Sequence, residues 1–558
     1  MSDRLIYLPL GGAGEIGMNA YVYGYGPAGK ERLILVDLGV TFGDMDTAPG
    51  IDLIMPDLRW LRQNRNRLEA IFLTHGHEDH IGAMGHLWEQ LDVPVYARAF
   101  TGALTRLKLE EMGHPSDTVR IVKPRPAVTT AGPFSVQFVP ISHSIPESSA
   151  LIIDTPAGRI VHTGDFKLDG TPVVGEAFDP ILWHDIAGED DGVKVLTCDS
   201  TNVFTVHPGR SEAVLANPLL DFVMAQQNMV VATTFASNIA RLKTLAQAGV
   251  AAGRQVCLLG RAMRRMVTVG VETGVLKDFP ATIGPEQAAD LPRHKVMLIV
   301  TGSQGERRAA SAQLSRGRYL GLSLSDGDSF LFSSRTIPGN ERGVIRIMNA
   351  LSELGVDVFD ADDGTFHVSG HANRPDLEAV HDLLKPKILI PMHGEHMHLR
   401  EHMLIARGKG IASEIAVNGN VVDLTGDAPR IVDQVETGRI YLDGTVLIGA
   451  MDGIVRDRIR MALNGHALVS VIVDEEDNVL PDAWVELMGL PDRTRGGDDL
   501  GRHIEGELAE FLEGADNRTV ADDGKMDEAL RKITRQVAME EIGKKPEVTV
   551  IISRLMAD

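Results

Sequence analysis

The segment that most constrains this chain is Thr-His-Gly-His-Glu-Asp-His at residues 74–80, which directly follows the apolar run Ala-Ile-Phe-Leu. His75 and His77 stand two residues apart, so an extended chain can turn both side chains toward one ion. Asp79 and His80 follow where a helix should begin, and they can face a second ion. Neutral imidazole and carboxylate are the ligands that suit Zn²⁺ and neighbouring metals. A chance His-rich loop is a poor alternative, because the chain holds only 19 histidines in 558 residues.

This His-x-His-x-Asp-His pattern resembles the metallo-β-lactamase superfamily. The resemblance implies further ligands downstream, each at the end of a strand. Three candidates follow in the right order, and they are His143 in Ile-Ser-His-Ser, Asp165 in His-Thr-Gly-Asp and His393 in Pro-Met-His-Gly. Any one of them alone could be an ordinary polar residue at a strand end. As an ordered set they predict a complete binuclear site.

Two further motifs narrow the resemblance. Cys-Asp-Ser-Thr-Asn occupies residues 198–202, and His-Val-Ser-Gly-His occupies residues 367–371. With the first motif they most closely resemble the ribonuclease J family of β-CASP nucleases, over essentially the whole chain. The resemblance implies two Zn²⁺ or Mn²⁺ ions per chain. One ion is expected on His75, His77 and His143, the other on Asp79, His80 and His393, with Asp165 as the bridge.

The same resemblance assigns roles around the metals. Asp199 and His371 are expected to hydrogen-bond each other and to handle the proton of the leaving group. His367 and Ser369 are expected to contact phosphate. Two more candidate phosphate contacts, in a strand-to-helix turn whose free N–H groups suit an anion, are Ser237 and Asn238. An ordinary helix N-cap is an equally good interpretation of Ser237.

The implied chemistry is two-metal phosphodiester hydrolysis, in which a hydroxide attacks phosphorus and the 3′ oxygen leaves. The product then carries a 5′ phosphate. The resemblance implies a 5′→3′ exonuclease that prefers 5′-monophosphorylated RNA, with some endonuclease action, in RNA decay and in rRNA and mRNA processing. A DNA-processing β-CASP nuclease and a small-molecule metallo-hydrolase, such as a lactonase or glyoxalase type, are the alternatives.

Strand and helix patterns predict an α/β protein with several domains. Short apolar strands with few helices in the first part fit a metallo-β-lactamase αββα sandwich. From about residue 206 strands alternate with helices, which predicts a parallel sheet in an inserted β-CASP domain. A small α/β domain follows at the C-terminal end. The predicted boundaries are 1–205 and 367–435 for the two parts of the sandwich, 206–366 for the insertion, 436–465 for a linker and 466–558 for the C-terminal domain.

Charge and composition limit the partners and the compartment expected for this protein. The net charge of −22 argues against a nucleic-acid partner when taken alone, although arginines cluster at 261–265 and 307–318. The N-terminal residues lack a signal-peptide pattern, and no apolar run approaches a membrane span. Cys198 and Cys257 lie in apolar runs, where buried thiols rather than a disulfide are expected. We therefore expect a cytoplasmic protein that binds single-stranded RNA and has no membrane partner. The resemblance adds a homodimer or homotetramer and RNA-degradation partners.

Several other histidines and carboxylates lie outside this predicted ligand set. His396, His398 and His402 crowd behind His393, and we expect them to be ordinary helix-surface residues, although the spacing of His398 and His402 would also suit a zinc helix. The resemblance also suggests a structural Ca²⁺ site around Asp52 and Asp443.

Overall fold

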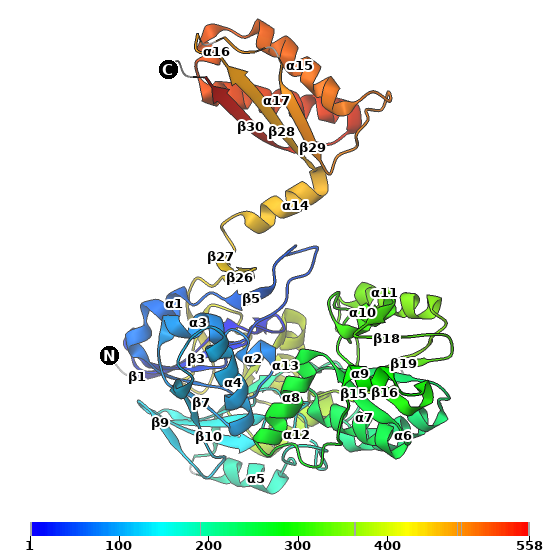
Figure 1. The fold of residues 1–558 in the computed structure, drawn as a ribbon. Helices are drawn as coiled ribbons and strands as arrows, with labels where there is room; N and C mark the ends of the chain where they lie inside the picture. The colour runs from blue at the N-terminus through cyan, green and yellow to red at the C-terminus, as the bar shows by residue number, and fades with distance from the viewer. Residues whose placement is uncertain (1–2, 190, 362–363, 477, 481, 556–558) are drawn as a thin grey trace. The chain divides into compact units, whose positions relative to one another are not determined.

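The computed structural model describes residues 3–189, 191–361, 364–476, 478–480 and 482–555. Its contacts divide the chain into two compact units. Unit 1 comprises residues 1–41 and 55–439, and unit 2 comprises residues 42–54 and 440–558. Figure 1 shows both units as mixtures of helices and strands.

Two large β-sheets are stacked on each other in unit 1. The eight-stranded sheet runs in the order β25 (Arg430–Gln434), β24 (Asn420–Asp423), β1 (Asp3–Gly11), β3 (Ala20–Pro27), β4 (Arg32–Val36), β6 (Leu68–Phe72), β7 (Val95–Ala97) and β8 (Val119–Ile121). The seven-stranded sheet runs in the order β23 (Ala412–Ser413), β21 (Ile388–Met392), β13 (Val193–Asp199), β12 (Gly158–His162), β11 (Ser149–Thr155), β10 (Phe134–Pro140) and β9 (Thr129–Ala131).

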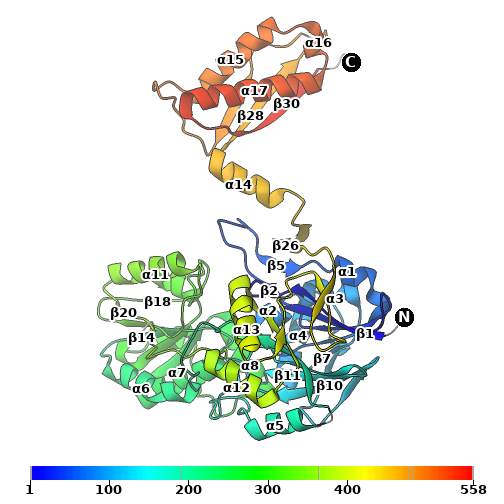
Figure 2. The same cartoon turned by 180° about the vertical axis from the view of Figure 1, so that it is seen from behind.

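The two sheets pack face to face over one apolar core, to which Phe72, Phe138 and Ile390 contribute. The helices beside the eight-stranded sheet are α1 (Arg59–Gln63), α3 (Met84–Leu91) and α4 (Ala99–Glu111). The outer face of the seven-stranded sheet packs with α5 (Pro180–Gly188), α12 (Arg374–Leu384) and α13 (His396–Gly408) through a second core that includes Trp183. The order helix, sheet, sheet, helix confirms the predicted αββα sandwich (Figure 2).

A five-stranded, wholly parallel sheet forms the rest of unit 1. Its order is β15 (Gln255–Leu259), β16 (Val296–Val300), β14 (Val230–Thr233), β19 (Ser329–Phe332) and β20 (Asp357–Phe359). Alternate residues of β14 enter opposite cores, as expected for a strand covered on both faces. Val230 packs with α6 (Ala216–Ala225), α7 (Ile239–Ala251) and α8 (Arg261–Glu272). Val231 packs with α9 (Pro285–Ala289), α10 (Ala310–Ser315) and α11 (Glu341–Glu353).

Unit 2 contains a three-stranded sheet in the order β29 (Trp484–Met488), β28 (His466–Val473) and β30 (Glu547–Arg554). Its core joins the sheet to α15 (Leu500–Gly514) and α17 (Asp523–Ile542). The segment predicted as a linker carries β26 (Arg439–Asp443), β27 (Val446–Gly449) and α14 (Ile454–Asn464), and α14 has no buried residue. Further short elements of the chain are β2 (Ala13–Gly14), β5 (Leu53–Pro56), β17 (Arg318–Tyr319), β18 (Leu322–Ser323), β22 (Gly394–Glu395), α16 (Asn517–Val520) and 3₁₀ turns.

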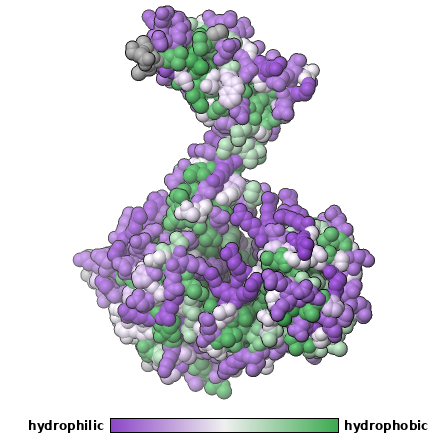
Figure 3. Space-filling view, viewed as in Figure 1, coloured by the Kyte–Doolittle hydropathy of each residue, from purple (hydrophilic) through white to green (hydrophobic). Residues whose placement is uncertain are grey.

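The inserted α/β domain and the small C-terminal α/β domain therefore agree with the predicted fold class, whereas the predicted domain boundaries stay predictions. One helix differs from expectation. The helix expected after residue 80 is divided into α2 (Glu78–Ile81) and α3. No helix in the described part of the chain is both long and apolar enough to cross a membrane. Hydrophilic residues cover much of the visible surface of each unit, with apolar areas scattered among them (Figure 3).

Candidate metal centre

The predicted ligands lie at the ends of strands from both large sheets. His75 and His77 occupy the loop after β6, while Asp79 and His80 lie in α2. The other sheet presents its candidates just after β10, β12 and β21, and these are His143, Asp165 and His393. The structure brings all seven residues together in two groups that share Asp165. Within each group the potential ligand atoms lie within 4.8 Å of one another.

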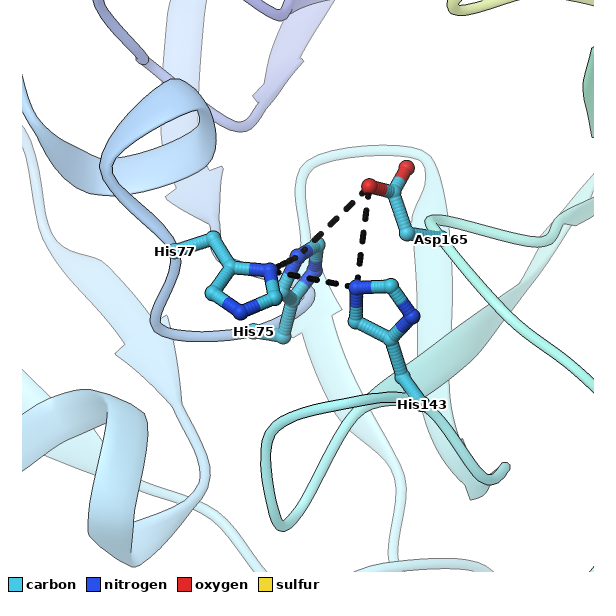
Figure 4. Close-up of side chains that lie close together, drawn as sticks. All are labelled: His75, His77, His143 and Asp165. Atoms are coloured by element: carbon cyan, nitrogen blue, oxygen red, sulfur yellow. Dashed lines mark hydrogen bonds and ion pairs between the residues drawn. The ribbon is translucent and has the colours of Figure 1, made fainter. Parts of the chain in front are cut away.

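The first group consists of three imidazoles and one carboxylate (Figure 4). His77 Nδ1 lies 3.1 Å from both His75 Nε2 and His143 Nε2. Asp165 Oδ2 lies 3.8 Å from each of the same two Nε2 atoms. The side chains come from different loops yet point toward one small volume. This is a donor set that suits a transition-metal ion.

The second group lies on the other side of the Asp165 carboxylate. His80 Nε2 is 3.2 Å from Asp165 Oδ2, and His393 Nδ1 is 3.0 Å from Asp165 Oδ1. His393 Nε2 lies 3.2 Å from Asp79 Oδ2. Asp165 is therefore placed where one carboxylate can serve both groups.

The predicted Asp199–His371 pair adjoins this centre. His371 Nδ1 donates a hydrogen bond of 2.8 Å to Asp199 Oδ2, and it lies 4.0 Å from Asp165 Oδ2. Burial opposes protonation of His371, but the Asp199 carboxylate outweighs it and raises the pKa of the imidazole. The His371 side chain is 22% exposed, and that of Asp79 is 31% exposed. Solvent therefore reaches the centre at these two residues.

Electrostatics show why the cluster fits divalent cations. Burial lowers the pKa of His75 and His143 and lowers that of His77 to about 4, so these rings are neutral ligands at neutral pH. Burial works the same way on His80 and His393, but Asp165 overcomes it and raises the pKa of both. Two imidazolium ions thus hold the positive charge that the carboxylates require when no metal is bound.

The carboxylates of the centre lack, among the described residues, the lysine or arginine partners that buried carboxylates usually have. Within the described residues, none of the carboxylates of Asp79, Asp165 and Asp199 pairs with lysine or arginine. The buried Oδ1 atom of Asp165 forms an ion pair with His393 Nδ1 at 3.0 Å but no well-aligned hydrogen bond to a described residue. Buried carboxylates ordinarily require a cation or several hydrogen bonds. The donor set, whose carboxylates pair with imidazoles and not with lysine or arginine among the described residues, therefore fits divalent metal ions.

A residue that the motifs did not reveal, Asp37, orients two of the imidazoles. It lies buried at the end of β4 with a left-handed backbone (φ 63°). Asp37 Oδ2 accepts from Thr74 Oγ1 at 2.7 Å and from His80 Nδ1 at 2.7 Å. Since the Thr74 hydroxyl donates to Asp37, it accepts from His75 Nδ1, 3.0 Å away. Protons are thereby held on both Nδ1 atoms, so Nε2 of each ring faces the centre. The position of Asp37 at a strand end was the available sequence signal.

The Asp199 turn is tied to the other candidate residues. Thr201 Oγ1 donates to Asp199 Oδ1 at 2.7 Å and lies 3.1 Å from His393 Nδ1. Asn202 Nδ2 donates to Ser369 Oγ at 2.7 Å, and that hydroxyl also accepts from the backbone N–H of His371 at 3.1 Å. Ser369 therefore positions the catalytic candidates, and its predicted phosphate contact stays a prediction.

The other substrate-binding candidates come after strands of the inserted sheet, Ser237 and Asn238 after β14 and His367 after β20. His367 is half-buried with no partner on Nδ1, and burial lowers its pKa to about 3. Asn238 is the N-cap of α7, since its Oδ1 accepts from the N–H of Arg241 at 2.9 Å. Ser237 is thus not the N-cap, which removes the structural alternative considered for it. Their contacts with phosphate remain predictions.

The expectation that His402 lies on a helix surface is wrong. Its side chain is fully buried, because that face of α13 packs against the seven-stranded sheet and α12. His402 Nε2 faces His381 Nε2 at 3.0 Å, and His402 Nδ1 faces Ser200 Oγ at 2.9 Å. Cys198, a buried free thiol like Cys257, lies within 4.8 Å of both rings. One shared proton satisfies the two facing nitrogens, whereas Nδ1 of His381 has no hydrogen-bond partner among the described residues.

The suggested calcium site has a competitor for its carboxylates. Arg458 Nη2 donates to Asp443 Oδ2 at 2.6 Å, and the N–H of Gly444 donates to Asp52 Oδ2 at 2.9 Å. A guanidinium thus occupies the place of a cation beside Asp443. The Ca²⁺ site stays a prediction.

Four family models match consecutive parts of the chain. They are the metallo-beta-lactamase superfamily (residues 14–209), the ribonuclease J beta-CASP domain (227–351), the Zn-dependent metallo-hydrolase RNA specificity domain (364–415) and the ribonuclease J C-terminal domain (453–555). All seven predicted metal ligands fall within the first and third matches.

Curated relatives match over most of their length. Ribonuclease J of Sinorhizobium meliloti is 39% identical over 99% of this chain and 98% of its own. Ribonuclease J 1 of Streptococcus pyogenes is 37% identical over 83% of this chain and 82% of its own. A crystal structure of a protein of unknown function from Enterococcus faecalis shares the fold, with a TM-score of 0.50 and 18% identity over 71% of this chain and 95% of that one.

Proposed function

The chain belongs to the ribonuclease J family of metallo-β-lactamase-fold ribonucleases, and from this we propose that it is a 5′→3′ exoribonuclease that prefers 5′-monophosphorylated single-stranded RNA. Some endonuclease action, and a part in RNA decay and in rRNA and mRNA processing, belong to the same proposal. A homodimer or homotetramer, RNA-degradation partners and a cytoplasmic location remain expectations.

The proposal rests on the closeness of two groups of residues, the candidate ligands for divalent cations and the carboxylate–imidazole pair Asp199–His371. Asp165 belongs to the first group, and its Oδ2 lies 4.0 Å from His371 Nδ1. A small-molecule hydrolase of this fold needs the metal ligands but not the pair. A nuclease needs both, because the leaving 3′ oxygen of a nucleotide is a poor leaving group unless it receives a proton.

The chain offers places for two cations, one on His75, His77 and His143, the other on Asp79, His80 and His393, with Asp165 between them. When bound, Zn²⁺ or Mn²⁺ would supply Lewis acidity, which neutralises charge on the phosphodiester and acidifies water. Which of the two metals is used, and that there are two, belong to the proposal.

The residues of the chain then act on the substrate. The Nδ1–H of His371 donates to the Asp199 carboxylate, which holds the ring in place. The protonated Nε2 of His371 is then free to donate to the departing 3′ oxygen. The raised pKa, caused by the Asp199 carboxylate, favours the protonated ring. Cleavage of the bond between phosphorus and the 3′ oxygen leaves the phosphate on the 5′ end of the product. Ser237, Asn238, His367 and Ser369 are proposed to hold the RNA phosphates.

The test compares three substrates with the metal-loaded protein, namely labelled single-stranded RNA, DNA of the same sequence and an ester. Cleavage of RNA well above DNA, with no ester turnover, is the expected result. Preferred DNA cleavage would point to a DNA-processing β-CASP nuclease, and ester turnover without nuclease action would point to a small-molecule hydrolase.

A further inference from the structure

One exposed aromatic side chain lies beside the metal centre and has no part in the chemistry described above. Phe204 is 47% exposed. Among the exposed large hydrophobic side chains of unit 1, within the described residues, it is the only aromatic one. An exposed phenyl ring offers a flat apolar face on which a planar ligand can stack.

The position of Phe204 follows from the turn that carries it. The turn begins at Asp199, and the polar side chains of Thr201 and Asn202 contact residues of the centre. Thr201 Oγ1 lies 3.2 Å from the carbonyl oxygen of His393, and Asn202 Nδ2 contacts the carbonyl of His371 at 3.4 Å. Phe204 comes two residues after Asn202, so its backbone follows directly from these contacts with His393 and His371.

The ring of Phe204 also rests on a residue of α13, the helix that follows His393. Its centroid lies 5.3 Å from that of His398, with 60° between the planes. His398 packs closely over Gly394, where an added Cβ would lie 2.9 Å from the Cβ of His398. The half-buried ring of His398 therefore supports one side of Phe204, while another side of the phenyl ring faces solvent.

The backbone holds this ring in place. The N–H of Thr205 donates to the carbonyl of Asn202 at 2.9 Å. Arg374, at the start of α12, donates its N–H to the carbonyl of Thr205 at 3.0 Å and its Nε to the carbonyl of Val203 at 3.1 Å. A fixed aromatic face loses little conformational entropy when a ligand stacks on it.

We propose that Phe204, supported by His398, is a stacking platform for one nucleobase of the RNA near the scissile phosphate. The ligand class is a purine or pyrimidine ring of a single strand, because only an unpaired base presents its flat face. The platform would fix the register of the strand without reading its sequence, since every base has such a face. This inference rests on the proposed cleavage of RNA.

A chemical double-mutant cycle tests the platform. The rate constant kcat/KM is measured for RNA oligonucleotides that each lack one base, with positions counted from the cleaved bond. In the wild-type protein, loss of the stacked base should lower kcat/KM on the order of 10- to 100-fold at one position. In Phe204→Ala the same abasic substitution should cost less than about 2-fold, because its partner is already gone.

Two variants separate stacking from packing. Phe204→Leu keeps an apolar contact with His398 but lacks a flat ring, and it should behave like Phe204→Ala. Phe204→Tyr should retain the wild-type penalty at that position. Val206→Ala, at a neighbouring side chain that is 72% exposed, serves as the matched control and should keep the wild-type profile.

The outcomes are distinguishable. If normal cleavage is accompanied by the same abasic penalties in the wild type and in both Phe204→Ala and Phe204→Leu, the platform is wrong and the proposed function stands. If the wild-type protein does not cleave the RNA that carries all of its bases, both proposals fail.

Discussion

The pairing of Asp199 with His371 gives the sharpest prediction. Asp199→Asn keeps the size of the side chain and its Oδ1 contacts with Thr201. It removes the carboxylate oxygen that accepts the proton of His371 Nδ1 at 2.8 Å. The imidazole then loses its orienting partner and the charge that raises its pKa, so less of the correctly placed acid is available. We expect slower cleavage with both metals retained.

The size of the effect follows from the bond that is lost. A hydrogen bond to a charged group contributes about 1.5–3 kcal/mol, which corresponds to about one to two pKa units. Asp199→Asn should therefore reduce kcat about 10- to 100-fold. His371→Ala removes the acid itself and should cost about 10²- to 10⁴-fold. Because the two residues act as one unit, the double variant should be little slower than His371→Ala.

The assay is single-turnover cleavage of one RNA by the wild type, the two single variants and the double variant, together with metal analysis of each protein. A substrate with a better leaving group should restore much of the rate of Asp199→Asn, since such a group needs no proton. The reasoning is refuted if Asp199→Asn loses metal, or if the two single effects multiply in the double variant.

Three further predictions concern the metals and the stability of unit 1. His80→Ala should abolish RNA cleavage while circular dichroism stays unchanged, because the ring serves the centre from α2, a helix of only 4 residues; a wild-type rate would exclude it as a ligand. Because the raised pKa values keep His80 and His393 protonated without metal at pH 7, Zn²⁺ binding should release about one to two protons and tighten as the pH rises; calorimetry in buffers of different ionisation enthalpy measures this, and no release would contradict it. Arg241→Met should lower the free energy of unfolding by about 3–5 kcal/mol, because the fully buried Arg241 pairs with the buried Glu212; an unchanged urea midpoint would show that this pair contributes nothing.

Much of the fold followed from sequence because its signals are local. Apolar runs of strand length marked β1, β4, β6 and four of the five parallel strands of the insertion, all but β20. Their alternation with helices predicted the parallel sheet. The metal motif was visible because His75 to His80 are neighbours in the chain. The distant candidates His143, Asp165 and His393 followed only from the resemblance, since nothing local requires three strand ends to meet.

What the sequence did not show depends on tertiary contacts. Asp37 lies 43 residues from His80, and no pattern links them, yet their hydrogen bond of 2.7 Å fixes the ring. His402 carries helix-surface spacing, but its face of α13 turns out to be the buried one. Ser369 resembled a phosphate contact, and only the structure shows that its hydroxyl binds Asn202. In each case the partner lies far along the chain.

The measurement that tests the central claim most directly is digestion of one single-stranded RNA carrying either a 5′ monophosphate or a 5′ triphosphate, with both ends of every product mapped. We predict mononucleotides released progressively from the 5′ end, faster from the monophosphorylated RNA, with each product bearing a 5′ phosphate. The activity should disappear with EDTA and return with Zn²⁺ or Mn²⁺. Products that shorten from the 3′ end, or that carry 3′ phosphates, would contradict the proposed polarity and the assignment of His371 as the proton donor.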